Sequence, residues 1–290
     1  VFCDVDESFN ISLESMKRML TEKTKALFLV HLLGQPADLE KIIPFCQENK
    51  LVLIEDSCES LGAEYQGVKV GNFGKMSSFS FYFGHHMTTI EGGMITTDDE
   101  ETYDLLKSIR SHGWVRGSQR EEKYQAEYGN THFIFDRMGY NLRSTNINAA
   151  IGLIQLQKLD QFIVQRKKNH ALFKEKLLGK IKMQKVFLNQ TSSFALAIIL
   201  DSKEMKDFLL KRLPTQGIEC RPIVAGNLLR QPVFKDWLRG KYQADECVQA
   251  DIINDRGLYL PNNQFIGEEE INYIIEKLEE LLNGYDRPEN

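Results

Sequence analysis

The sequence predicts an α/β protein with a mixed, mostly parallel sheet in its first half and a smaller α/β domain in its second half. The first observation is that short apolar runs alternate with an amphipathic stretch over residues 25–60, as in a strand, a helix and a second strand. The second is that another set of strand and helix patterns follows residue 180. A chain of 290 residues can form one large or two smaller cores.

The opening elements define a β-α-β unit. Apolar runs predict strands at 25–34 and 50–57, and the amphipathic stretch 37–50 between them predicts a crossover helix. The chain itself opens on a strand-like segment at Val1, with no preceding element to cover that strand. We therefore expect that the natural protein has more chain before Val1, so that the N-terminal part of this fold is missing here.

Further elements complete the first domain, for which we predict residues 1–180. Segments 77–83 and 92–97 are strand candidates, and 98–113 begins with acidic residues suited to a helix N-terminus. From Ser144, apolar residues at helical spacing follow a Ser/Thr cap and predict one long connecting helix over 144–180.

The second domain, predicted for residues 181–290, repeats the alternation of strands and helices on a smaller scale. Apolar runs predict strands at 193–200 and 217–224, and helical periodicity predicts helices at 204–213 and 268–282.

Composition excludes several classes of protein. No run approaches the roughly 18 apolar residues of a membrane span, and the first residues do not resemble a secretion signal, so we expect a cytoplasmic protein without membrane partners. The five cysteines contain no C-x-x-C pair, which argues against a zinc knuckle or a disulfide framework. The net charge of −5, with dispersed Lys and Arg, argues against nucleic-acid binding but leaves room for a small anionic ligand.

Two segments carry candidate chemistry. Asp56 ends a strongly apolar strand, and open α/β sheets bind ligands beyond the carboxyl ends of their strands, although Asp56 taken alone fits better as a cap of the next turn. Segment 77–93 combines hydroxyls such as Ser80 with the adjacent histidines His85 and His86, and a histidine can act as a base near neutral pH. Tandem histidines alone more often form a turn or a core pair; together with Asp56 they favour a ligand site.

Six stretches resemble, in order, the DegT-type nucleotide-sugar aminotransferases, which have the type I pyridoxal-phosphate fold. The resemblance runs from Val1 to about Leu282, and the stretches are residues 27–42, 51–67, 71–99, 109–113, 138–160 and 217–234. It implies a large cofactor-binding domain, a smaller C-terminal domain and the cofactor pyridoxal 5′-phosphate.

The resemblance assigns roles to individual positions. Asp56 matches the carboxylate that pairs with the cofactor's protonated pyridine nitrogen, and Glu59 matches the polar position beside the ring hydroxyl. Ser80 matches the hydroxyl that binds the cofactor phosphate. Asn141 matches an amide that reaches the phosphate of the neighbouring subunit, which implies a homodimer with shared active sites.

His85 is the most informative departure, because it stands where the family pattern has its cofactor-binding lysine. Without that amine, pyridoxal phosphate or pyridoxamine phosphate would be held noncovalently. One histidine branch of the family consists of sugar 3-dehydratases, in which L-glutamate regenerates pyridoxamine phosphate and the histidine removes a proton while the 3-hydroxyl leaves. The resemblance thus implies a nucleotide sugar, GDP-4-keto-6-deoxymannose or similar, as substrate.

A second histidine branch uses an iron–sulfur cluster and should show several cysteines after residues 109–113. Residues 112–130 contain none, so we expect no iron–sulfur cluster. For the substrate we single out Arg143 and Arg221 as partners of the nucleotide diphosphate, although each fits a surface ion pair at least as well, and Asn227 as a residue near the sugar.

Two other functions remain open. The chain could be an aminotransferase in which another amine, conceivably that of Lys75, replaces the missing one. It could also be a homologue that binds cofactor or sugar without catalysing a reaction.

Overall fold

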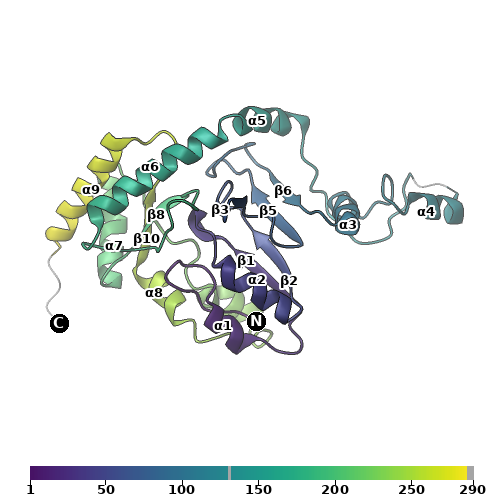
Figure 1. Ribbon diagram of the computed structural model, residues 1–290, viewed down its shortest axis with the longest axis horizontal. Helices are drawn as coiled ribbons and strands as arrows, with labels where there is room; N and C mark the ends of the chain where they lie inside the picture. The colour runs from purple at the N-terminus through teal and green to yellow at the C-terminus, as the bar shows by residue number, and fades with distance from the viewer. Residues whose placement is uncertain (130–131, 286–290) are drawn as a thin grey trace.

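The computed structural model describes residues 1–129 and 132–285 and contains two four-stranded sheets, one in each half of the chain (Figure 1). The first is formed by β1 (Ala26–Val30), β2 (Val52–Asp56), β5 (Met76–Ser80) and β6 (Gly93–Thr96). β1, β2 and β5 run parallel, whereas β6 is antiparallel to β5. The mixed, mostly parallel sheet predicted from the sequence is confirmed.

The β-α-β crossover has the predicted helix, α2 (Leu39–Glu48), which buries Leu39, Ile42, Phe45 and Cys46. These residues recur at helical spacing, so one face of α2 packs on the buried face of the sheet. Leu27 and Leu29 of β1 belong to the same hydrophobic cluster. The crossover also places the carboxyl ends of β1 and β2 side by side, with Val30 paired to Asp56.

Glu55, beside Asp56 on β2, points to the opposite side of the strand and is completely buried. Its carboxylate accepts hydrogen bonds from the backbone N–H groups of Gly71 (2.8 Å), Phe73 (2.8 Å) and Gly74 (2.6 Å), and from Nε2 of His31 (3.0 Å). Burial alone would raise the pKa of Glu55, but these hydrogen bonds lower it below its usual value. Glu55 therefore ties β2 to the loop that leads into β5.

The strand expected at Val1 does not form; Phe2 and Val5 make only isolated bridges, to Ala244 and Ile11. The one helix expected over 144–180 is two helices, α5 (Asn146–Leu156) and α6 (Leu159–Leu177). At their junction the backbone N–H of Lys158 bonds three residues back, to the carbonyl of Gln155 (3.0 Å), and this tighter turn separates the two helices. The predicted Ser/Thr cap is Thr145, which accepts the N–H of Asn148.

The second sheet lies beyond residue 180 and is antiparallel, in the order β7-β8-β10-β9. The strand predicted at 217–224 is reduced to two residues. The strands are β7 (Lys182–Met183), β8 (Ala195–Ile199), β9 (Arg221–Pro222) and β10 (Gly257–Pro261), and helices α7 (Lys203–Arg212), α8 (Val248–Arg256) and α9 (Glu268–Asn283) accompany them. Leu196, Leu258 and Ile271 lie in its fully buried core. Division into domains at residue 180 stays a prediction.

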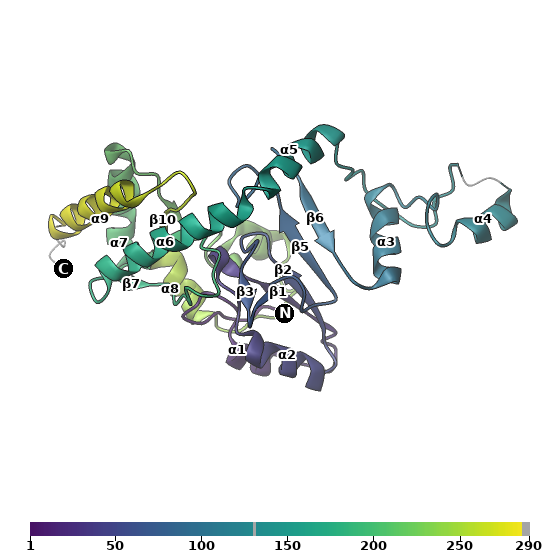
Figure 2. The ribbon, with the colours of Figure 1, turned by 45° about the horizontal axis from the view of Figure 1, so that its top comes forward.

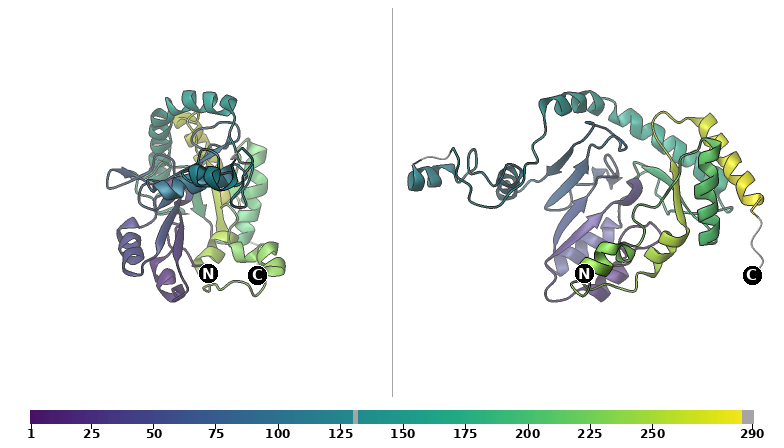
Figure 3. Two further views of the ribbon diagram at one scale, coloured as in Figure 1. Left: turned by 90° about the vertical axis from the view of Figure 1, so that its right-hand side faces the viewer. Right: turned by 180° about the vertical axis from the view of Figure 1, so that it is seen from behind.

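A long arm leaves the first sheet after α3 (Glu100–Arg110), carries α4 (Glu121–Tyr128) and returns at α5 (Figure 2). Seen from behind, α5 and α6 run along one side of the molecule above both sheets (Figure 3). The remaining elements are short: α1 (Leu13–Met19), β3 (Glu64–Tyr65), β4 (Val68–Lys69), η1 (Leu32–Gly34), η2 (Leu213–Gln216), η3 (Leu228–Arg230) and η4 (Val233–Trp237). No helix within the described residues is long and apolar enough to span a membrane.

Candidate active site

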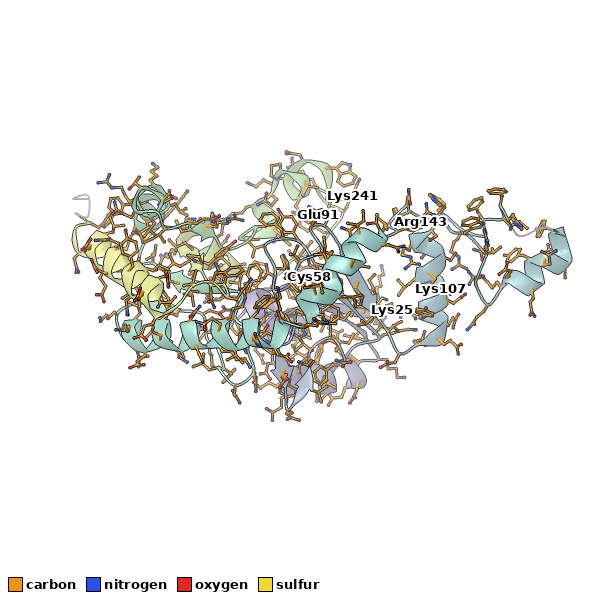
Figure 4. All side chains as sticks on the ribbon, turned by 90° about the horizontal axis from the view of Figure 1, so that it is seen from above. Lys25, Cys58, Glu91, Lys107, Arg143 and Lys241 are labelled. Carbon is orange, nitrogen blue, oxygen red and sulfur yellow. The ribbon has the colours of Figure 1, made fainter. Side chains whose placement is uncertain are left out.

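A cavity of about 1130 Å³ runs along the edge strand β1 and reaches the carboxyl ends of β1 and β2. Asp56, Cys58 and Glu59 line it from the turn after β2, and His85 lines it from the turn after β5. Residues 223–226 of the second half form part of the opposite wall. Three of the residues singled out from the sequence thus share one cavity, at the sheet edge where α/β proteins bind ligands. Figure 4 labels Cys58 in this central part of the molecule.

The two carboxylates differ in their surroundings. Asp56 is half-buried, and its Oδ1 accepts the backbone N–H of Cys58 (3.0 Å), which closes the turn after β2. Glu59 accepts the backbone N–H of Leu33 (2.9 Å). Burial raises the pKa of Glu59, the Leu33 bond partly offsets this, and the nearby charge of Asp56 adds to the increase. Asp56 can face a cationic group in the cavity, whereas Glu59 is suited to a neutral hydroxyl.

His85 is held by the backbone of the neighbouring turn. Its Nδ1 lies 2.6 Å from the carbonyl oxygen of Cys58, and because a carbonyl can only accept, Nδ1 carries the hydrogen. In the neutral ring Nε2 is then an unprotonated acceptor, and no other residue that the structure describes bonds to it. Its ring also packs edge-on against the rings of Tyr82 (6.1 Å) and Phe194 (5.1 Å). The chain thus sets the tautomer that a general base requires.

Burial lowers the pKa of His85, and the positive charge of Arg166 lowers it too. The hydrogen bond to Cys58 and the negative charge of Asp56 raise the pKa but do not cancel this decrease. Arg166 of α6 is buried and donates Nη1 to the carbonyls of Phe194 and Asn262. Burial lowers the pKa of Arg166 to about 10, so it remains cationic at neutral pH. His85 is therefore a neutral base near pH 7.

His86 does not share this role, since it is buried and its Nε2 bonds to the carbonyl of Ser192. Burial, together with the charge of Arg166, lowers the pKa of His86 to about 3. This neutral imidazole packs beside Phe194, whose ring also contacts His85.

Ser80 ends β5, paired with Gly93. Its hydroxyl accepts the backbone N–H of Tyr82 (3.3 Å). Ser80 precedes His85 by five residues but does not line the cavity. Its predicted contact with a cofactor phosphate stays a prediction.

Asn141 and Arg143 lie apart from the cavity, on the returning end of the arm. Asn141 forms a backbone bridge to Ser111, and its Oδ1 accepts Nε of Arg143 (3.2 Å). Both side chains are exposed, and Figure 4 labels Arg143 beside α5. Within one chain neither residue reaches His85's cavity, so a role there requires a second subunit.

The other two predicted substrate residues have partners within the chain. Arg221 is exposed and paired with Glu219. Asn227 is buried; it donates to Asp251 (2.9 Å) and accepts the N–H of Leu229 (2.9 Å) as the cap of η3. Its neighbours Gly226 and Leu228 line the cavity, but Asn227 does not. Both substrate roles stay predictions.

Lys75, the amine considered as a replacement, precedes β5 and pairs with Asp99 (3.7 Å). Because β2 and β5 are parallel, Lys75 lies at the opposite edge of the sheet from Asp56 and does not line the cavity.

The sequence did not reveal the roles of the Cys58 carbonyl and of Arg166, because neither a backbone contact nor the burial of an arginine produces a recognisable residue pattern. The described residues contain no group of three His, Cys, Asp or Glu placed to hold a metal.

Residues 1–279 match the model of the DegT/DnrJ/EryC1/StrS aminotransferase family. GDP-4-keto-6-deoxy-D-mannose 3-dehydratase of Yersinia pseudotuberculosis is 37% identical over 94% of this chain and 72% of the relative. GDP-perosamine synthase of Escherichia coli O157:H7 is 32% identical over 97% and 72%. A solved structure of GDP-4-keto-6-deoxymannose 3-dehydratase with pyridoxal phosphate and glutamate trapped together superposes with a TM-score of 0.85 at 37% identity, covering 95% of this chain and 73% of that one. The chain is therefore a member of the DegT/DnrJ/EryC1/StrS aminotransferase family.

Proposed function

We propose that this chain catalyses the 3-dehydration of a nucleotide-linked 4-keto-6-deoxy sugar with pyridoxal and pyridoxamine phosphate, as a step of deoxysugar biosynthesis. The observation that carries the proposal is His85, which stands at the position of the family's lysine and presents an unprotonated Nε2 in the cavity that Asp56 also lines. A relative named as a dehydratase and one named as a synthase are 37% and 32% identical to this chain. The residue at position 85 therefore distinguishes the two reactions better than overall sequence identity does.

The cavity residues fit the cofactor. Asp56 offers a carboxylate for a protonated pyridine nitrogen, and the same carboxylate accepts the backbone N–H of Cys58 at Oδ1. Glu59, with its raised pKa, fits beside the ring hydroxyl. When bound, pyridoxamine phosphate supplies the amine that condenses with the sugar's 4-keto group and a ring that accepts electrons. We place the phosphate at Ser80 and at Asn141 of a second subunit.

His85 takes the proton in this scheme. Nε2 is the atom that would accept a proton from the methylene of the bound cofactor, and the cofactor would supply the electron pair that expels the 3-hydroxyl. The resulting imidazolium can protonate that leaving oxygen, so one proton is removed and one returned and water is lost. The Cys58 carbonyl keeps the ring orientation throughout, because Nδ1–H donates to it in both charge states.

The position of Lys75 disfavours the aminotransferase alternative. The lysines that do line the cavity are Lys23, Lys25 and Lys241. Lys25 directly precedes β1, and therefore lies at the opposite edge of the sheet from Asp56. No family pattern places an amine at any of these positions.

For the substrate we propose GDP-4-keto-6-deoxymannose or a close analogue, with L-glutamate as the amino donor. The names of the relatives support a GDP-linked sugar and the trapped glutamate supports the donor. Arg143, Arg221 and Asn227 are our candidates for contacts with the substrate. We place the reaction in the cytoplasm without an iron–sulfur cluster; the five free cysteines are consistent with that compartment.

We also propose a homodimer. The arm and α5 expose large apolar side chains, which in a monomer would face water. Among them Met138 is 95% exposed and Ile147 is 73% exposed, and the others include Phe133, Tyr140, Leu142, Leu153 and Leu156. A dimer through this surface would bury them and bring Asn141 toward the partner's cavity. Ile147→Asp should shift the sedimentation coefficient to that of a monomer; an unchanged value would remove this surface from the interface.

The test of function is incubation of the protein with pyridoxal phosphate, L-glutamate and 4-keto-6-deoxy nucleotide sugars, followed by mass spectrometry. Loss of the 3-hydroxyl oxygen supports the dehydratase, gain of an amino group supports the aminotransferase, and neither supports a binding homologue. Borohydride reduction provides a second readout, because the wild-type protein should carry no covalent cofactor. An adduct mapped to any lysine would overturn the proposal.

A further inference from the structure

Within the described residues, the imidazole of His85 has a hydrogen bond at one atom, Nδ1, which donates to the carbonyl oxygen of Cys58 (2.6 Å). This bond sets where Nδ1 lies but leaves the ring able to turn about it, because the outer torsion of a histidine side chain has no sharp minimum. The direction of Nε2 therefore depends on what packs against the ring. The rings of Tyr82 and Phe194 do so, with centroids 6.1 Å and 5.1 Å away and planes inclined by 81° and 68°.

These two neighbouring rings are not held equally firmly. Tyr82 belongs to the same turn as His85, whose backbone N–H donates to the Tyr82 carbonyl (3.0 Å), and Tyr82 is 40% exposed. Phe194 comes from the second half of the chain, directly before β8, and its backbone is bonded on both sides. Its N–H donates to the carbonyl of Leu33 (3.0 Å), and its own carbonyl accepts Nη1 of Arg166 (3.0 Å). Phe194 is therefore the contact that ties the imidazole to the rest of the molecule.

A glycine allows the segment that carries Phe194 to come this close. Gly34 has a left-handed backbone (φ 87°), and a Cβ atom there would lie 2.8 Å from both the nitrogen of Phe194 and the carbonyl oxygen of Ser192. The backbone N–H of Ser192 donates to the carbonyl of Gly34 (2.9 Å). Leu33, one residue earlier, is buried and also left-handed (φ 53°), a costly conformation that persists only where its surroundings hold it. Two strained residues in succession thus dock residues 192–194 beside the turn of His85.

The same segment also holds the next residue of that turn, His86. The buried Nε2 of His86 bonds to the carbonyl of Ser192, and the centroid of its ring lies 5.9 Å from that of Phe194. Residues 85–86 are therefore docked on residues 192–194 at two points, one polar and one aromatic. The ring of Phe194 and the turn of His85 keep a fixed relation to each other.

We propose that Phe194 is a positioning residue for His85: its ring fixes the plane of the imidazole and thereby the direction of Nε2. The inference rests on the proposed function, in which His85 is the base, and adds to it the residue that aims this base. Phe194 does not line the cavity, so it acts through the imidazole and not through contact with a ligand. A base must come within about 2.6–3.2 Å of the atom whose proton it takes, and a misplacement of about 1 Å can slow a reaction about a hundredfold.

The experiment is a single turnover of the Phe194→Leu enzyme, loaded with pyridoxamine phosphate and mixed with a saturating 4-keto-6-deoxy nucleotide sugar. Leucine keeps an apolar side chain and both backbone bonds but removes the ring. We expect the dehydration rate to fall by about tenfold or more. Cofactor affinity and the half-saturating sugar concentration should not change, because Asp56 and Glu59 keep their hydrogen bonds. An unchanged rate, or a lower rate with equally weakened cofactor binding, would overturn the inference.

Phe265→Leu is the matched control, because Phe265 is 83% exposed, packs on Phe162 (6.5 Å) and does not line the cavity. It should react at the wild-type rate, and a rate as low as that of Phe194→Leu would also contradict the proposal. Phe194→Met, whose flexible side chain fills more of the same space, takes the place of Phe194→Leu if the latter does not fold.

Deuterium at the methylene carbon of pyridoxamine phosphate separates the aim of the base from a general structural effect. A tilted imidazole slows proton transfer in particular, so Phe194→Leu should show a primary isotope effect at least as large as that of wild type. A slower reaction with a smaller isotope effect, or with none, would overturn the inference. A wild-type enzyme that removes no oxygen from the sugar would refute the proposed function and this inference with it, whereas an active wild type matched by Phe194→Leu refutes the inference alone.

Discussion

His85→Asn tests the base with the smallest structural change. An asparagine amide can still donate to the Cys58 carbonyl, which His85 reaches at 2.6 Å, so the turn keeps its hydrogen bond. What is lost is the edge contact with Tyr82 and Phe194, each worth about 0.5–1.5 kcal/mol. The expected loss of about 1–3 kcal/mol is small beside the roughly 5–15 kcal/mol of a stable domain. The variant should therefore fold and bind cofactor.

The chemical step should respond much more strongly. An amide cannot take the methylene proton, and a general base typically contributes about 10² to 10⁴-fold to the rate. The assay is a single turnover of enzyme loaded with pyridoxamine phosphate and mixed with a 4-keto-6-deoxy nucleotide sugar, quenched over time and read by mass spectrometry. This loading bypasses the glutamate reaction.

His112→Asn is the control, because His112 is exposed, lies outside the cavity and has a left-handed backbone (φ 64°) that asparagine tolerates. It should dehydrate the sugar at the wild-type rate. A fall of less than tenfold for His85→Asn, with cofactor binding retained, would refute the assignment of His85 as the base.

Three further variants test the site and its surroundings. His85→Lys should create a covalent cofactor link that borohydride traps at residue 85; an unmodified protein after reduction would contradict the geometry described for this position. Asp56→Asn should slow the glutamate reaction, followed by absorbance, by about tenfold or more, since a charge-assisted bond to the pyridine nitrogen is lost, and an unchanged rate would remove Asp56 from the site. The third variant concerns His170, a buried residue of α6, whose pKa burial lowers to about 4. An unfolded histidine titrates near 6.5, so between these two values the unfolded chain binds one more proton than the folded chain. The free energy of unfolding should therefore fall by about 1.4 kcal/mol for each pH unit by which the pH decreases. In urea unfolding the stability advantage of wild type over His170→Gln should narrow from pH 6.5 to 4.5; a gap independent of pH would refute the buried neutral state.

The sequence was most informative where chemistry and periodicity coincide. Asp56 could be placed at a strand end because its strand is strongly apolar, and Glu59 and His85 then fell at matching positions in a motif whose spacing the fold conserves. Contacts made by the backbone could not be anticipated: nothing in a side-chain pattern shows that the Cys58 carbonyl would hold His85.

The errors have similar origins. The helix expected over 144–180 is divided by a local tightening of hydrogen bonds at Lys158, which apolar spacing does not report. Asn227 was predicted to lie near the sugar, and that role stays a prediction; the sequence did not show that its amide also donates to Asp251 and caps η3. Such competition between a ligand and the protein's own backbone is decided only by three-dimensional packing.

The adjacent acids Glu55 and Asp56 show how the scaffold selects its catalyst. Neighbouring residues of a strand face opposite sides, so sliding β2 by one position would put Glu55 in the place of Asp56, or Asp56 in the place of Glu55. Glu55 opposes such a slip, because its carboxylate would have to leave the three backbone N–H groups and the imidazole that it binds. A mutation at Glu55, which does not line the cavity, could therefore weaken cofactor binding indirectly, because β2 would lose the bonds that fix its register and with it the direction in which Asp56 points.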